Sequence, residues 1–215
     1  MLIDLSQEFS EQMPYSSKFP APSIEPIRDV EADGINVQQY SSNTHLGTHL
    51  DAPRHFVPDG HTIEQLSLDR VSGTGVIIDV VKTSPEAITV ADVEASSNTV
   101  REDDIVLLYT GWGEKYGTEQ YEPHPWITTD LAKWFVDRDI NLVALDVLTP
   151  DIPWSHRPDD WDEFPVHREL LNNEVLIAEN LGNLARLAEQ RVDVFGFPIK
   201  ISGADGAPAR FVAKK

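Results

Sequence analysis

The segment from residue 45 to residue 55 reads His45-Leu46-Gly47-Thr48-His49-Leu50-Asp51-Ala52-Pro53-Arg54-His55. Three histidines and one carboxylate stand at odd positions of this segment, and the whole chain has only seven histidines. Imidazole and carboxylate are the usual ligands of Zn²⁺ and also suit Mn²⁺ and Fe²⁺. The chain has no cysteine, so no thiolate competes for a cation. The segment therefore predicts a metal site, and the alternative is a polar turn with its histidines at the surface.

The spacing of the histidines tests whether residues 45–55 form a helix or a strand. A helix would align His45 with His49 but would turn Asp51 about 200° away from His49, and Gly47 and Pro53 disfavour a helix. A strand puts the odd positions on one face, but a straight one would separate the Cα atoms of His45 and His49 by about 13 Å. We therefore expect a bent segment, with the bend at Gly47, which lacks a Cβ.

The composition indicates a globular protein of one domain, residues 1–215. A chain of 215 residues with 40% hydrophobic residues is long enough to bury a full core. No stretch approaches 18 apolar residues, so we expect no membrane span. The first five residues resemble a strand and lack the regions of a signal peptide, which predicts a cytoplasmic protein. The absence of cysteine fits a reducing compartment.

The formal net charge of −19 excludes one class of partner and leaves two explanations open. Nucleic acid is not an expected partner, because its phosphates would be repelled. The 36 acidic residues are spread along the chain and outnumber the 17 basic ones. The protein is either adapted to a high-salt cytoplasm, where screening removes the self-repulsion, or an ordinary acidic enzyme.

Hydrophobic patterning predicts a mixture of strands and helices around one core, and hence an α/β or α+β fold. The proline-rich segment 13–22 cannot be regular structure. Strands are expected at residues 1–5, 35–40, 75–81, 105–109, 142–147, 175–178, 192–199 and 209–212. Helices are expected at residues 128–138, 167–172 and 181–191.

A second set of polar residues follows in the last third of the chain. Glu179 comes directly after the apolar run 175–178, and His167 begins the short helix before it. A carboxylate at the end of a strand is well placed to face a cleft. The alternative is that Glu179 simply begins the next helix, where acidic residues are favoured.

Taken together, these segments resemble the cyclase family of metal-dependent hydrolases, which contains bacterial-type kynurenine formamidases and isatin hydrolases. The motif H-x-G-T-H-x-D-x-P-x-H of that family is matched at seven fixed positions between residues 45 and 55. The resemblance continues through Asp79, residues 109–112, Asp146, His167 and residues 179–181. It covers the chain from about residue 3 to residue 199.

The resemblance implies a fold, an assembly and a metal site. The fold would be a compact α/β domain with a mixed, barrel-like sheet and flanking helices, assembled as a homodimer or homotetramer. Two divalent cations, Zn²⁺ or Mn²⁺, would be bound in each subunit. The residues that match the family's metal ligands are His45, His49, Asp51, His167 and Glu179. Asp51 and Glu179 match ligands that bridge the two cations.

The resemblance also implies an activity, namely hydrolysis of the C–N amide bond of a small aryl formamide such as N-formylkynurenine in tryptophan catabolism. Bound cations would lower the pKa of water and polarise the carbonyl, and His55 matches the catalytic acid/base. Hydrolysis of an isatin-like cyclic amide is one alternative, and a dehydratase or ring-closing reaction at the same site is another. A metal-binding protein without turnover would not need histidine at position 55.

Aromatic residues of the N-terminal loop are the candidates for substrate contact. Kynurenine formamidases of the family tend to carry a Trp-Pro step there, whereas this chain has Tyr15 and Phe19-Pro20. An aromatic wall is therefore expected, with a different shape. Trp112, which follows Gly111, is a further candidate for the pocket, and the alternative for it is a position in the core or at the rim.

The two explanations of the acidic composition predict different responses to salt. If the chain is salt-adapted, its thermal midpoint rises by several degrees between low salt and molar KCl, because salt screens the repulsion among carboxylates. Differential scanning fluorimetry over a KCl series measures this, and a midpoint that stays flat or falls contradicts salt adaptation.

Overall fold

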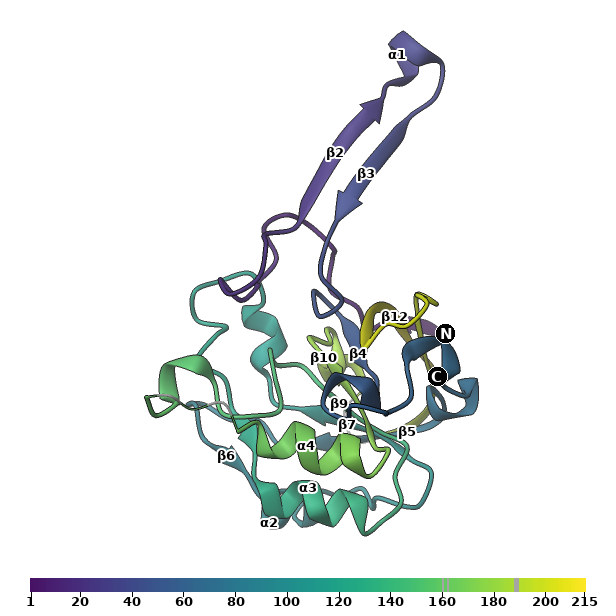
Figure 1. The fold of residues 1–215 in the computed structure, drawn as a ribbon. Helices are drawn as coiled ribbons and strands as arrows, with labels where there is room; N and C mark the ends of the chain where they lie inside the picture. The colour runs from purple at the N-terminus through teal and green to yellow at the C-terminus, as the bar shows by residue number, and fades with distance from the viewer. Residues whose placement is uncertain (160, 162, 188–189) are drawn as a thin grey trace.

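The apolar runs of the sequence form the strands of one sheet in the computed structural model, which describes residues 1–159, 161, 163–187 and 190–215 (Figure 1). Four consecutive strands of this sheet run parallel to one another: β5 (Ser72–Asp79), β7 (Ile105–Tyr109), β9 (Leu142–Leu145) and β10 (Leu176–Glu179). The other four strands pair antiparallel: β1 (Leu2–Asp4), β4 (His49–Asp51), β11 (Arg191–Pro198) and β12 (Gly206–Lys214).

The sheet closes on itself. Its order is β1-β12-β11-β5-β7-β9-β10-β4, and β12 also pairs with β4. Seven strands therefore form a closed barrel, to which β1 adds along β12. This confirms the expected α/β domain with a mixed, barrel-like sheet.

Alternating residues of the central strands face two separate cores. In β5, Val76 and Ile78 face the helices, whereas Ile77 lies with the second cluster, which includes Leu107 and Phe211. All of these side chains are completely or almost completely buried. Strands that are buried on both faces require apolar residues at every position, and this explains the continuous apolar runs in the sequence.

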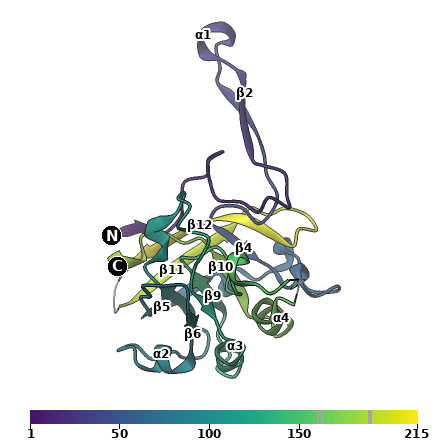
Figure 2. The same ribbon diagram turned by 90° about the vertical axis from the view of Figure 1, so that its left-hand side faces the viewer.

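Short helices cover the outer face of the parallel strands (Figures 1 and 2). They are α2 (Val90–Glu94), α3 (Thr129–Val136) and α4 (Pro165–Asn172), and the small pair β6 (Ala87–Ile88) and β8 (Trp126–Ile127) lies beside them. The side chain of Thr128 accepts a hydrogen bond from the Leu131 amide and so caps α3, as the sequence predicts. Within the described part of the chain, no helix is long and apolar enough to cross a membrane.

A hairpin arm projects away from the barrel (Figures 1 and 2). It consists of β2 (Ser23–Arg28), the single-turn helix α1 (Val30–Asp33) and β3 (Val37–Ser41). Only β3 was expected from the sequence, as a strand over 35–40. The arm exposes several apolar side chains, among them Ile27, Val30 and Ile35.

The expected helix over 181–191 is wrong. In this segment only Leu184–Leu187 forms a 3₁₀ turn, Arg191 already belongs to β11, and residues 188 and 189 lie outside the described residues. The Leu181 amide donates to Leu145 O and the Gly182 amide to Leu5 O. These bonds to distant segments replace the bonds that a helix would have formed.

Gly196 marks a tight contact in the barrel wall. It pairs with Phe211 across β11 and β12, and a Cβ at position 196 would lie 2.0 Å from the Phe211 ring. We expect Gly196→Ala to lower the free energy of unfolding by about 1–3 kcal/mol through overpacking. Urea denaturation measures this, and in a Phe211→Leu background the same substitution should cost less. If Gly196→Ala lowers the free energy of unfolding equally in both backgrounds, the loss does not come from contact with the Phe211 ring.

Candidate metal centre

The position of β4 between β10 and β12 brings the polar residues of two distant segments together. Strand β4 is antiparallel to β10, and His49 is the Cα partner of Glu179. Residues directly opposite each other in an antiparallel pair point to the same face, as do residues two positions apart in one strand. His49, Asp51 and Glu179 therefore share one face, as the sequence predicts for His49 and Asp51.

The chain bends at Gly47, as expected. Gly47 has φ +62°, a left-handed conformation that favours glycine. Its carbonyl oxygen accepts a hydrogen bond from His49 Nδ1 at 2.9 Å and one from the Asn180 side-chain amide at 3.0 Å. Because Nδ1 of His49 is occupied in this way, its Nε2 is left for a ligand.

Imidazole nitrogens and carboxylate oxygens converge at the centre of this face. His49 Nε2 lies 3.3 Å from Asp51 Oδ1 and 3.3 Å from Glu179 Oε2. His167 Nε2 lies 3.3 Å from Glu179 Oε1 and 3.6 Å from Asp51 Oδ2. Each carboxylate thus turns one oxygen toward His49 and the other toward His167.

Three of these converging atoms have no hydrogen-bond partner although they are buried: His49 Nε2, Asp51 Oδ2 and Glu179 Oε1. Unpartnered buried polar atoms are costly, so their convergence at one point needs a compensating group. Oxygen and imidazole nitrogen donors that are left open in this way fit a divalent cation. The residues present therefore fit the metal site that the sequence predicts.

His167 is held by an aspartate that the sequence analysis missed. Asp151 Oδ2 accepts a hydrogen bond from His167 Nδ1 at 2.6 Å and one from the His167 amide at 3.1 Å, and Oδ1 accepts from the Val166 amide. The carboxylate thereby fixes both the start of α4 and the ring of His167. Carboxylates that orient a histidine ligand are a common feature of metal sites. No local pattern in the sequence indicated this contact.

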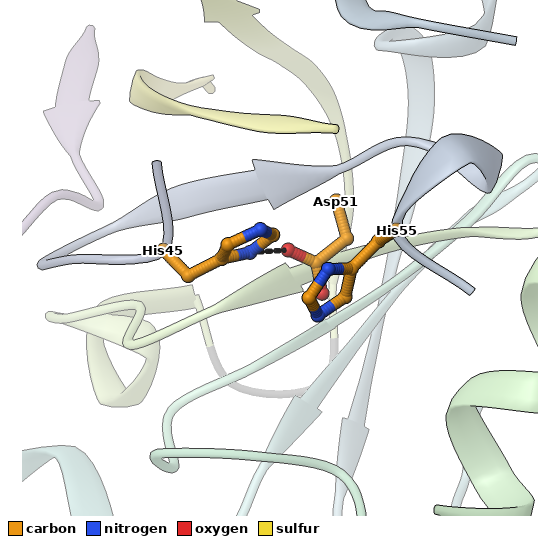
Figure 3. Close-up of side chains that lie close together, drawn as sticks. All are labelled: His45, Asp51 and His55. Carbon is orange, nitrogen blue, oxygen red and sulfur yellow. Dashed lines mark hydrogen bonds and ion pairs between the residues drawn. The ribbon is translucent and has the colours of Figure 1, made fainter. Parts of the chain in front are cut away.

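His45 and His55 lie beside Asp51 (Figure 3). His45 Nδ1 is 2.7 Å from Asp51 Oδ1, and the rings of His45 and His55 are stacked with their centroids 3.8 Å apart. Ligand atoms of His45, Asp51 and His55 lie close enough to hold an ion together, and so do those of His49, Asp51 and Glu179. Asp51 belongs to both groups.

The electrostatics of the cluster favour positive charge. Burial alone would lower the pKa of His45, but Asp51 and Asp205 outweigh it and raise that pKa to about 10. Burial likewise opposes charge on His167, yet Asp151, Asp51 and Glu179 hold its pKa well above the usual value. Carboxylates that keep protons on buried imidazoles will also stabilise a cation in place of those protons.

A pocket of about 390 Å³ opens above the cluster and is walled by aromatic side chains. Its lining includes the predicted contact residues Tyr15 and Phe19, and also Phe56, Trp154 and Phe164.

Trp112 is not part of the wall of this pocket. It is 3% exposed, packs in the core on the helix side and donates its indole N–H to Tyr121 O, which corrects its expected role at the pocket.

The barrel and the cluster define an α/β protein with a candidate site for a divalent cation. The chain matches the family described as "Putative cyclase" over residues 3–152, and the protein belongs to this cyclase family. It is 28% identical to the kynurenine formamidase of Bacillus cereus over 184 residues, which are 86% of this chain and 82% of the relative.

Solved structures that share the fold include the following two. The first is isatin hydrolase A from Ralstonia solanacearum, with a TM-score of 0.88 and 22% identity, covering 99% of this chain and 91% of the other. The second is described as a predicted metal-dependent hydrolase from Bacillus stearothermophilus. It has a TM-score of 0.79 and 26% identity, and the match covers 99% and 97% of the two chains.

A cation that binds at the unpartnered atoms should stabilise the folded protein by mass action. We expect Zn²⁺ at a hundred times its Kd to stabilise the metal-free protein by about 2.7 kcal/mol, or about 5–10 °C in thermal midpoint. Glu179→Ala should abolish most of this shift. His61→Ala, which changes an exposed histidine paired with Glu174, should retain it. If Zn²⁺ raises the thermal midpoint equally in Glu179→Ala and His61→Ala, the cation does not bind at Glu179.

Proposed function

We propose that the protein is a metal-dependent hydrolase that cleaves the C–N amide bond of a small aryl formamide, with N-formylkynurenine as the first candidate. The observation that carries this proposal is the convergence of unpartnered His49, Asp51 and Glu179 atoms at the base of an aromatic-walled pocket. The similarity to a kynurenine formamidase over most of both chains supports the reaction class.

The arrangement of the ligands supports a proposal of two cations. One would be held on the side of Asp51 Oδ1, where His45 Nδ1 and His49 Nε2 lie, and the other on the side of Oδ2, with His167. Glu179, which turns one oxygen to each side, would bridge them with Asp51. Divalent cations bound there would lower the pKa of water and polarise a carbonyl oxygen.

The side chains above the cluster divide the remaining tasks. His55, whose Nδ1 is 3.2 Å from Asp205 Oδ2, is partly exposed beside the pocket and is placed to carry a proton to the leaving nitrogen. Tyr15, Phe19 and Trp154 offer flat apolar surface to an aryl ring.

The position of Lys18 favours an amino-acid substrate, such as N-formylkynurenine, over a neutral bicyclic amide, such as isatin. Lys18 lines the same pocket, and its Nζ lies 5.5 Å from the centroid of a Trp154 ring. A cation beside the aromatic wall suits a substrate that carries both an aryl ring and a carboxylate, as N-formylkynurenine does. Isatin has no carboxylate, so it is the second substrate to assay.

Replacing His55 tests the proton-transfer role. We expect His55→Ala to lower kcat for N-formyl-L-kynurenine by about 10²–10⁴ while Zn²⁺ binding is kept, because a proton carrier is lost but a bridging carboxylate is not. Kynurenine release, measured by absorbance with and without a chelator, gives the rate, and His61→Ala is the matched control. Turnover near the wild-type rate removes His55 from the mechanism.

Parallel assays with isatin distinguish the substrate from the reaction class. If the protein hydrolyses isatin but not N-formyl-L-kynurenine, it is an amide hydrolase and not a formamidase. A protein that binds Zn²⁺ but hydrolyses neither amide contradicts the proposed function. The expected homodimer or homotetramer, the cytoplasmic location and the role in tryptophan catabolism stay predictions.

A further inference from the structure

The carboxylate of Asp205 contacts two histidines at once. Its Oδ2 lies 3.0 Å from His45 Nε2 and 3.2 Å from His55 Nδ1. Its Oδ1 accepts a hydrogen bond from the Thr44 hydroxyl at 2.9 Å. Asp205 is 160 residues from His45 in the sequence, and neither the metal-binding motif nor its resemblance to the family includes this residue.

The barrel closure holds Asp205 in this position. Its carbonyl oxygen accepts the Ala52 amide at 2.9 Å, and the next residue, Gly206, pairs with Asp51 across β12 and β4. A Cβ at position 206 would lie 2.5 Å from His45 Cε1, so the His45 ring packs directly on the backbone beside Asp205. The carboxylate is therefore fixed with respect to both rings by backbone contacts on each side of it.

An ionised carboxylate only accepts hydrogen bonds, and this determines which nitrogen of each histidine carries a proton. His45 presents Nε2–H to Asp205, and its Nδ1 faces a second carboxylate oxygen, Asp51 Oδ1, at 2.7 Å, so Nδ1 also carries a proton until a cation takes the place of that proton. His55 must present Nδ1–H, which leaves Nε2 as the nitrogen that can accept or release a proton. With a cation at Nδ1 of His45, a single acceptor oxygen would thus hold N–H at Nε2 of one ring and at Nδ1 of the other in a stacked pair.

We propose that Asp205 is a positioning residue that fixes the tautomer and orientation of both His45 and His55. This inference rests on the proposed function for the role of each histidine, but the contacts themselves do not depend on the substrate. It assigns one carboxylate to two tasks: it keeps Nδ1 of His45 available to a cation, and it keeps Nε2 of His55 available for proton transfer.

Two substitutions separate positioning from simple loss of charge. Asp205→Ala removes the acceptor, whereas Asp205→Asn keeps one acceptor oxygen in the same place without the charge. Asp59→Ala removes an equivalent charge from an exposed turn and serves as the control. If positioning is the role, Asp205→Asn behaves much like the wild type and Asp205→Ala does not.

The direct measurement is nitrogen-15 NMR of histidine-labelled, Zn²⁺-loaded protein, which identifies the protonated ring nitrogen. We expect His55 as the Nδ1–H tautomer in the wild type and in Asp205→Asn, and a shift toward Nε2–H in Asp205→Ala. Competition with a chromophoric chelator gives the Kd for Zn²⁺, which should rise about 10–100-fold in Asp205→Ala and recover largely in Asp205→Asn.

The outcomes differ from those that test the substrate. Unchanged histidine spectra and an unchanged Kd in Asp205→Ala overturn the proposal, as does an equal loss in Asp59→Ala. An Nε2–H tautomer of His55 in the wild type also overturns it, and that measurement needs no variant to fold. Failure to hydrolyse any amide, with the spectra as expected, contradicts the proposed function and leaves the positioning role standing.

Discussion

The pairing of β4 with both β10 and β12 is the contact on which the rest of the structure depends. Strand β4 consists of three residues, His49–Asp51, which close the barrel and include two of the proposed ligands, His49 and Asp51. The register that places His49 opposite Glu179 also places Asp51 opposite Gly206, next to Asp205. A shift of one residue would turn every one of these side chains to the other face. The register that completes the fold thus also assembles the site.

This closure buries charged groups that an apolar core would not tolerate alone. Asp51 is 1% exposed and Glu179 is 6% exposed. Burying such groups without partners costs several kcal/mol each. Neighbouring histidines compensate part of that cost: His45, His167 and His49 hold the pKa of Asp51 well below its usual value despite burial. The atoms that remain unpartnered are those that face the centre of the cluster, which is where a cation would complete the compensation.

The sequence predicted what local pattern determines and missed what long-range closure determines. The bend at Gly47 and the cap at Thr128 follow from residue type and spacing, and the structure has both. The helix over 181–191 failed because bonds to distant parts of the chain hold that segment in another conformation. The arm strand β2 contains a proline and mostly exposed residues, so it gave no core signal. The contacts of Asp151 and Asp205 depend on residues brought together by folding.

The central proposal is that both oxygens of Asp51 face cation sites, one on each side. X-ray diffraction from crystals grown with Zn²⁺, collected on both sides of the zinc absorption edge, tests it most directly. The account predicts two anomalous peaks in each chain, one beside His49 and Asp51 Oδ1 and the other beside His167 and Asp51 Oδ2. A single peak held by His45, Asp51 and His55, or none next to Asp51, would contradict it.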